Sequence, residues 1–565
     1  MLHYPTRLSQ TTKMSRSTTR PVHNRVLWTF ALVAVFFFRL GFGLSKELFT
    51  EDETQVYLIG LRHHATHRWQ YFGPDVVWTE SQIPGGLLAL LVGVPLDLVP
   101  IPEAPYVLVN LLSMGTLCVF AAYLSERLPG IPQWLNWGWL LTLPWTLEYS
   151  THILNSAYVL PASLIFFIGF FEVFPPLTTG RVRPAVAYAL IGAAIGWIMQ
   201  LHMSWPLLLP FAGVALLARW REGPRAAVLA FTAFALGATT TMSLIVPTFL
   251  AYGQDGGDIG RNIDIHWRDP ISTFVSVVAR LLSFASFEVA RFVAGTGGAR
   301  GFVYLAEHWW MVPVTVLVWL AGNLHPLWMA ATAFRRSTAF AEWPAVRWVA
   351  VATALGVTAS FHFVIEPEQA RSYFIVAPVA MLYAAYCWTF IDSRRWRRIA
   401  AVVLTANVIF QIALAVYRFH GPSLYLARPV VAEAIRQSRP EILGYRRAFA
   451  RDVPAASRTP PDSARTAVAD LEVVSAERSR AAPGYTSWAL VVHNRSTTTG
   501  YRELICLTNY YAASGALLEQ RRTEILIVVG PGATVPARVI DRSRWRPDAA
   551  RAELVLDTAE PMQSM

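Results

Sequence analysis

Long apolar segments recur along the chain up to about residue 418, and they constrain its fold more than any other feature. A helix needs about 20 apolar residues to cross the hydrocarbon core of a bilayer. Eleven segments approach that length and composition: 25–44, 105–124, 133–149, 155–174, 185–200, 204–219, 226–250, 309–333, 346–364, 371–391 and 398–417. With 54% hydrophobic and 15% charged residues, the chain is too apolar for an ordinary soluble protein. The sequence therefore predicts an all-α polytopic membrane domain.

A twelfth apolar stretch, "IPGGLLALLVGVPLDLVPIP" at 83–102, is short, carries Asp97 and is interrupted by Gly and Pro. If this stretch does not cross, the N-terminus and the basic loops all fall on the cytoplasmic side, as the positive-inside rule requires. These loops hold Arg127, Arg181, Arg183, Arg219, Arg221, Arg225, Arg335, Arg336 and the basic run 394–398. We therefore predict a re-entrant or interfacial hairpin on the outer face.

The formal net charge of +11 is explained by these loops and by the tail after residue 418. No nucleic-acid partner is expected. The first apolar run is longer than a usual signal sequence and lacks a small-residue cleavage site, which favours an uncleaved first helix. The predicted location is the inner (plasma) membrane, multi-pass, with a cytoplasmic N-terminus.

Unusual polar residues then gather on the outer face. Asp52 and Glu53 directly follow the first span in "LSKELFTEDETQVYLIGLR". Adjacent carboxylates at a membrane edge repel each other, which favours proton uptake by one of them, as a general base requires. The alternative is a solvated helix N-terminus with Thr50 as its cap.

Three further outer segments supply candidate substrate-binding residues. The turn "EYSTHILNSAY" contributes Glu148, His152 and Asn155, and "QLHMSW" contributes His202. Arg371 in "EPEQARSYFIVAP" is a candidate to bind a phosphate through bidentate hydrogen bonds from its guanidinium group. For each of these residues a plain interfacial role is the alternative.

His63 and His67 share a helical face in "HHATH", but no Glu of the metalloprotease type accompanies them, so no metal site is predicted. Phosphate-binding glycine loops, dinucleotide fingerprints and serine nucleophile elbows are missing from the sequence. A nucleotide-driven pump is therefore disfavoured.

Four motifs together carry a family resemblance: "EDETQVYLIGLR", "TESQIPGGLLALL", "LTLPWTLEYSTHILNSAYVLP" and "ARSYFIVAPVAMLY". Their order resembles the GT-C membrane glycosyltransferases, and more closely the branch that contains protein O-mannosyltransferases and lipid A aminoarabinose transferases. The resemblance extends over roughly residues 25–418, mainly through topology.

The resemblance implies a polyprenyl-phosphate-linked sugar as donor and a lipid, glycan or protein as acceptor. It implies that Asp52 is the catalytic base and that Glu53 orients it or binds acceptor, with inversion at the sugar. Glu80 and Tyr373 would line the substrate site by the same resemblance. Two positions depart from the pattern. Asn155 stands where the aminoarabinose enzymes have an acid, and Ser81 and Gln82 follow Glu80 where those enzymes have a Lys.

Phosphate binding would then fall to Arg371, with Arg62 or a divalent cation as alternatives; no cofactor is otherwise implied. Two other functions remain open. A lipid-linked saccharide exporter would require polar residues at mid-depth in the spans, which the sequence largely lacks. An O-antigen ligase or polymerase would rely on outer-loop arginines such as Arg280 in the predicted 251–308 loop.

The tail after residue 418 predicts a basic helix, either on the membrane surface or solvated, and a Pro/Ser/Ala-rich linker. Short β-branched runs then predict a small all-β sandwich on the outer face. The predicted units are a cytoplasmic tail (1–24), a GT-C-like transmembrane domain (25–418), a helix and linker (419–467) and a β-sandwich accessory domain (468–565).

Overall fold

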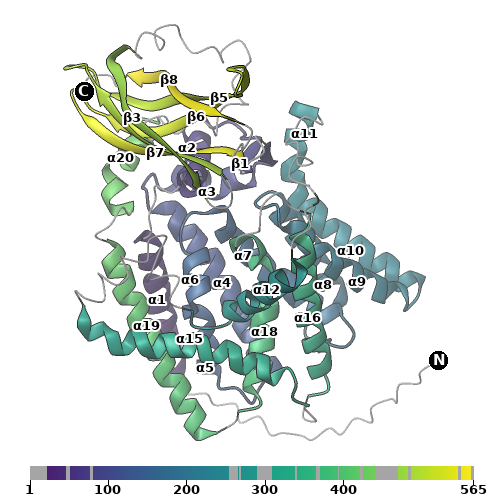
Figure 1. Ribbon diagram of the computed structural model, residues 1–565. Helices are drawn as coiled ribbons and strands as arrows, with labels where there is room; N and C mark the ends of the chain where they lie inside the picture. The colour runs from purple at the N-terminus through teal and green to yellow at the C-terminus, as the bar shows by residue number, and fades with distance from the viewer. Residues whose placement is uncertain are drawn as a thin grey trace, which may run out of the picture.

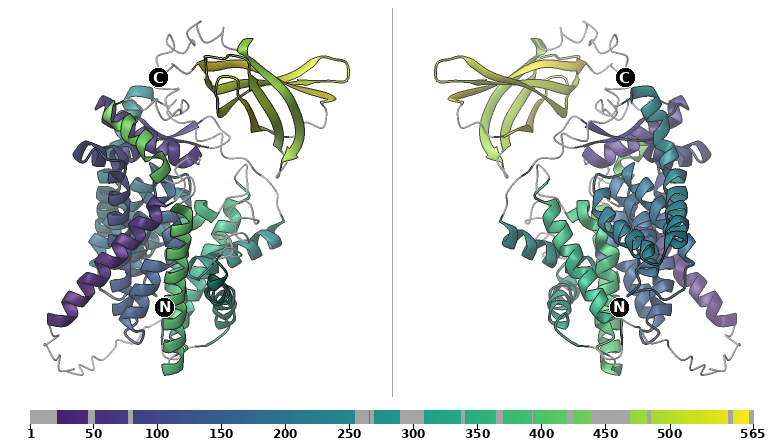
Figure 2. Two further views of the ribbon diagram at one scale, coloured as in Figure 1. Left: turned by 90° about the vertical axis from the view of Figure 1, so that its left-hand side faces the viewer. Right: turned by 90° about the vertical axis from the view of Figure 1, so that its right-hand side faces the viewer.

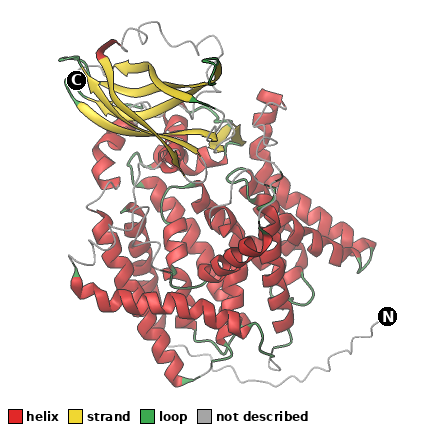
Figure 3. Ribbon diagram, viewed as in Figure 1, coloured by secondary structure: helices red, strands yellow, loops and turns green. Residues whose placement is uncertain are grey.

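The computed structural model describes residues 22–45, 51–76, 81–253, 265, 269–288, 308–336, 340–363, 370–391, 393–419, 424–438, 469–481, 485–544 and 549–561. Figures 1 and 3 show a large helical bundle and, beyond one of its ends, a group of strands. Before the strands, the main elements are α1 (Val22–Leu44), α2 (Glu51–Thr66), β1 (Phe72–Val76), β2 (Ser81–Pro84), α3 (Leu87–Leu98), α4 (Ala104–Arg127), α5 (Gln133–Thr142), α6 (Pro144–Ser150), α7 (Val159–Val173), α8 (Pro184–Met199), α9 (Leu209–Trp220), α10 (Pro224–Met242), α11 (Val246–Tyr252), α12 (Pro270–Phe284), α15 (Val312–Thr332), α16 (Trp343–Ser360), α17 (Ala370–Tyr373), α18 (Ala377–Trp388), α19 (Arg394–Phe419) and α20 (Leu424–Arg436). Short 3₁₀ turns join several of them, including η1 (Asn155–Tyr158), η2 (Trp205–Leu208), η3 (Ser243–Ile245), η6 (Trp309–Met311) and η7 (Phe374–Val376).

Helices occupy all eleven segments that the sequence predicted as spans. Six stretches of the described chain are long and apolar enough to cross a membrane: Val26–Leu44, Ala104–Arg127, Asn155–Val173, Pro224–Tyr252, Trp309–Thr332 and Arg394–Arg418. Shorter apolar helices accompany them. Helix α15 differs from the other long helices, because it lies across α19 and not along it (Figure 1). The protein is thus a multi-pass membrane protein, and the full number of spans stays a prediction.

Two predicted segments are organised differently in the structure. The span expected at 133–149 is broken at Leu143, because Pro144 has no N–H and forces the preceding residue out of the helical region (ψ 128°). The loop expected over 251–308 contains α12, whose Val277, Leu281 and Phe284 recur at helical spacing and are buried. Ser, Thr and Arg residues interrupt the apolar positions of this 15-residue helix, so its sequence shows no continuous apolar run that would predict a span.

Helices α2 and α3 and the β1–β2 hairpin lie together at one end of the bundle, called here the α2 end (Figure 1). Two glycines let α2 and α3 touch. A Cβ on Gly60 would come 2.3 Å from Val92, and one on Gly93 would come 2.9 Å from the Gly60 carbonyl oxygen. Since α1 ends and α4 begins at this same end, the stretch at 83–102 does not cross the bundle, as predicted.

Helix α20 returns to the α2 end and packs on protein. Val431, Ala434 and Ile435 are buried, and Arg428 pairs with Glu103 at 2.5 Å just before α4. One face of this helix thus packs on α2. Whether its other face lies on the membrane surface or in solvent stays a prediction.

Six strands follow: β3 (Leu471–Ala481), β4 (Tyr485–Asn494), β5 (Tyr501–Tyr511), β6 (Leu517–Val529), β7 (Thr534–Arg544) and β8 (Arg551–Pro561). They form two antiparallel sheets, in the orders β3-β4-β7 and β6-β5-β8, whose inner faces share one apolar core (Figure 2). Small antiparallel sheets are therefore present where the sequence predicted a β-sandwich. Asn494, in the sequence Asn-Arg-Ser, is fully buried and donates to the carbonyl oxygens of Thr499 and Gly530, so it is not placed to accept a glycan.

Candidate active site at the α2 end

A buried acid and a buried histidine meet where α2 covers the bundle. Glu53 Oε1 lies 3.3 Å from His152 Nε2, and the two side chains are only 10% and 4% exposed. The other carboxylate oxygen, Oε2, and the other ring nitrogen, Nδ1, have no hydrogen-bond partner among the described residues. Buried polar groups are nearly always paired, so two open positions on one buried Glu–His contact favour a site for a polar ligand.

Tyrosines line the same region. Tyr57 donates its hydroxyl to the Pro102 carbonyl oxygen at 3.1 Å. Burial raises the pKa of Tyr57 well above its usual value, and nearby Tyr106, Glu103 and Tyr158 raise it further. Tyr57 is therefore a neutral hydrogen-bond donor at any physiological pH. The Tyr158 hydroxyl is buried without a described partner, which adds a third open polar group to the region.

The predicted base, Asp52, lies in the first turn of α2, one residue before Glu53. Its side chain and that of Arg371 fall outside the described part of the structure, and so does Glu80. Their roles remain predictions.

The predicted outer turn at 148–158 runs from the end of α6 into η1, and the structure places its polar residues apart. Glu148 Oε2 accepts from Arg418 Nη1 of α19 at 3.1 Å, and this arginine was not singled out from the sequence. Asn155 uses its side-chain oxygen to accept the backbone N–H of Ser156. Of the three residues predicted in this turn, His152 is the one placed against Glu53 among the described contacts. His202 is hydrogen-bonded to Ser204 at 2.9 Å, and its role in the site stays a prediction.

A second cluster, formed by aromatic rings around Trp145 of α6, includes the predicted Tyr373. Trp145 packs against Tyr149, Phe374 and Phe284, and Phe284 in turn contacts Tyr373 with ring centroids 5.6 Å apart. We call these five residues the Trp145 cluster. The sequence offered no signal for it, because its members come from α6, α12 and the segment 370–376.

Among the described side chains, the cation of Arg280 lies beside this cluster. Arg280 donates to both carboxylate oxygens of Glu288, at 2.8 and 2.7 Å, and its guanidinium stands 5.2 Å from the Trp145 ring centre. Trp145 Nε1 donates to the same carboxylate at 3.1 Å. Arg280 is partly exposed, so its remaining donors can meet an anion. Helix α6 thus connects the Trp145 cluster to the Glu53–His152 pair.

Two histidines of α2, and His67 just after its end, gather around one acid of α3. His64 Nδ1 is 2.7 Å from Asp97 Oδ1, and His63 and His67 approach the same carboxylate at 3.8 Å. Within the described ranges, no group of three or more His, Cys, Asp or Glu side chains has the arrangement of a metal site. The contacts show α2 and α3 joined through Asp97.

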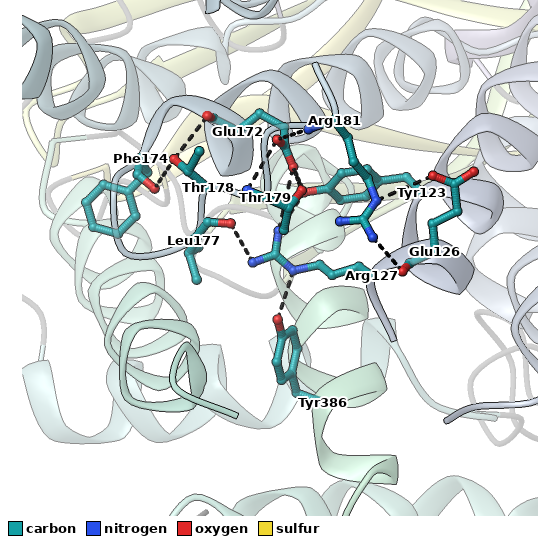
Figure 4. Close-up of polar contacts among 10 residues, drawn as sticks. All are labelled: Tyr123, Glu126, Arg127, Glu172, Phe174, Leu177, Thr178, Thr179, Arg181 and Tyr386. Atoms are coloured by element: carbon teal, nitrogen blue, oxygen red, sulfur yellow. Dashed lines mark hydrogen bonds and ion pairs between the residues drawn. The ribbon is translucent and has the colours of Figure 1, made fainter. Parts of the chain in front are cut away.

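At the opposite end of the bundle, a buried ion pair between Arg127 and Glu172 offers a contrast (Figure 4). Arg127 and Glu172 are 3.9 Å apart and at most 1% exposed. Arg127 donates to Tyr386, Tyr123 and the Leu177 carbonyl oxygen, while Glu172 accepts from Tyr123, Thr179 and the Arg181 backbone. Both charged groups are engaged on several sides by protein. This network is structural, whereas the Glu53–His152 pair has open positions.

The solved structures that are similar to this chain include two membrane glycosyltransferases. One is ArnT from Cupriavidus metallidurans bound to undecaprenyl phosphate, at 13% identity over 74% of this chain and 75% of that chain, with a TM-score of 0.40. The other is the arabinosyltransferase EmbB from Mycobacterium smegmatis, at 12% identity over 97% of this chain, with a TM-score of 0.34. The chain spans 66% of EmbB.

No family model and no curated protein matches the sequence. Structural likeness at these scores carries no conclusion about activity. Support for a function has to come from the site.

Proposed function

We propose that the chain is an integral-membrane glycosyltransferase of the GT-C type. It would move a sugar from a polyprenyl-phosphate carrier to an acceptor hydroxyl at the α2 end of the bundle, with inversion. The observation that carries the proposal is the buried Glu53–His152 pair, whose Oε2 atom has no described partner. A buried carboxylate with one open oxygen is suited to hold a hydroxyl group.

The reaction requires a base, a stabiliser for the departing phosphate and a place for a lipid. In the proposed scheme, Asp52 takes the proton of the acceptor hydroxyl, and Glu53 either orients Asp52 or accepts a hydrogen bond from another polar group of the acceptor through Oε2. The acceptor oxygen attacks the anomeric carbon, whose bond to the phosphate oxygen breaks. The products are the glycosylated acceptor and the polyprenyl phosphate, and the proton stays on the carboxyl group.

Two arginines are proposed for the phosphate. Arg371 is assigned by its sequence motif, and Arg280 by its place beside the Trp145 cluster, where it is partly exposed. A lipid carrier suits this site, because the site is built from membrane helices and the Trp145 cluster provides an apolar wall next to a cation.

The test compares lipid extracts of cells that lack the protein, cells with Asp52→Asn and cells with Glu53→Gln, all at matched expression where protein is present. Mass spectrometry of the extracts identifies any polyprenyl-phosphate sugar. We expect one lipid-linked monosaccharide to accumulate in all three strains. Glu433→Gln is the matched control, since it changes an acid at the α2 end that lies on α20, outside the site, and it should leave the lipid pool unchanged.

Other outcomes would favour the alternatives. Accumulation of a diphosphate-linked oligosaccharide, with no change in monosaccharide carriers, would support a ligase or polymerase. If Asp52→Asn and Glu53→Gln both behave as the unaltered protein does, the proposed catalytic site is wrong.

A further inference from the structure

Arg39 is a fully buried arginine in the α1 span, and the sequence motifs did not single it out. Its Nη1 donates to the Leu141 carbonyl oxygen and its Nη2 to Ser150 Oγ, both at 2.8 Å. Longer contacts of 3.4 Å reach the hydroxyl and the carbonyl oxygen of Thr146. None of its hydrogen bonds within the described residues goes to a carboxylate. A buried charge is costly, so this position requires an explanation.

The explanation begins at the break between α5 and α6. Pro144 has no N–H, so the last carbonyl groups of α5 lose their normal helical partners. Side chains replace them. Thr146 Oγ1 donates to the Leu140 carbonyl oxygen at 3.2 Å, Arg39 to that of Leu141, and Asn407 of α19 to that of Thr142 at 2.8 Å. Arg39 is tolerated because it sits at the negative end of a helix.

Helix α4 holds the far end of α6 in the same way. Ser113 donates to the Ser150 carbonyl oxygen at 2.8 Å, and Asn110 donates to that of Thr151 at 2.7 Å. Gly43 of α1 also lies against Thr151, since a Cβ there would be 2.0 Å from the same carbonyl oxygen. Side chains from two spans therefore fix the backbone up to the residue before His152.

We propose that Arg39 is a positioning residue for the Glu53–His152 pair. By joining the end of α5 to Ser150, it sets where α6 ends and hence where His152 meets Glu53. The consequence for catalysis rests on the proposed function, but the positioning itself does not depend on it. Lysine cannot replace the planar guanidinium group of Arg39. Its side chain has one nitrogen, whereas Arg39 uses two nitrogens that point to different partners.

The first measurement is hydrogen exchange of the purified full chain in detergent, comparing the unaltered protein with Arg39→Lys. We expect amides in 145–154 to exchange about tenfold faster, while those in α7 (159–173) stay protected. Arg127→Lys is the matched control, because it alters an equally buried arginine at the opposite end. It should leave exchange in 145–154 unchanged. Unchanged exchange there in Arg39→Lys would overturn the positioning role.

The second measurement asks whether Arg39 acts through His152. Arg39→Lys should raise the lipid-linked sugar pool, since a displacement of about 1 Å can cost about a hundredfold in rate. In a His152→Gln background, Arg39→Lys should add little further. Full additivity would indicate a general structural role and overturn the proposal.

If Arg39→Lys does not fold, Ser150→Ala removes one partner of the arginine and keeps the charge in place; the same local rise in exchange is expected, and its absence would count against the proposal. Failure of the proposed function would appear differently. Exchange in 145–154 would respond to Arg39→Lys, but the lipid pool would respond to neither Asp52→Asn nor Glu53→Gln.

Discussion

The Arg127–Glu172 pair allows a prediction of stability whose size follows from the structure (Figure 4). The closest charged atoms are 3.9 Å apart, with side chains 1% and 0% exposed. Coulomb's law with an effective dielectric constant of about 20 gives an attraction of about 4 kcal/mol at that distance. Arg127→Met leaves the Glu172 carboxylate buried without its cation, and Glu172→Gln leaves the arginine without its anion. Each change is expected to lower the free energy of unfolding by about 3–5 kcal/mol.

The double variant distinguishes the ion pair from the hydrogen bonds around it. If the two charges act mainly on each other, Arg127→Met with Glu172→Gln should cost less than the sum of the single changes, by about 4 kcal/mol. Denaturant titration in detergent, followed by tryptophan fluorescence, measures all four free energies. The four values together give the interaction free energy between the two side chains.

Additive losses would refute this reasoning. They would mean that the hydrogen bonds of Arg127 to Leu177 and Tyr386, and those of Glu172 to the 179–181 backbone, stabilise the network without the charge pair.

Three further predictions concern other parts of the chain. Gly43→Ala should lower both thermal stability and activity, because its methyl group would lie 2.0 Å from the Thr151 carbonyl oxygen, and a normal melting temperature would contradict this. Burial raises the pKa of the Cys506 thiol to about 12, so only about one thiol in ten thousand is ionised at pH 8, and maleimide should label it only after denaturation. Arg428→Ala breaks a partly exposed pair with Glu103 and should change stability by less than about 1 kcal/mol, as a melting curve would show; a larger loss would mean that this pair, and not apolar packing, holds α20 in place.

The sequence alone determined the class of protein and much of its topology. Apolar segments long enough to cross a bilayer are a property of local composition, so a helix occurs at all eleven predicted positions. The basic loops placed the stretch at 83–102 at the same end as α2, and α3 lies there. The β-branched runs of the tail likewise predicted the strands of the sandwich.

Only the tertiary structure decided which polar residues meet. Glu53 and His152 are far apart in sequence, and nothing in either motif predicts their contact. The sequence likewise does not predict that Glu148 pairs with Arg418 or that His202 is hydrogen-bonded to Ser204. The positioning role proposed for Arg39 could not be predicted from the sequence, for a related reason. One arginine in an apolar run has little effect on hydropathy, and its partners are carbonyl groups freed by a helix break in another span. Composition is a local property, so it can be read directly from the sequence. The pairing of buried polar groups depends on how the helices pack against one another, and no local sequence pattern predicts that packing.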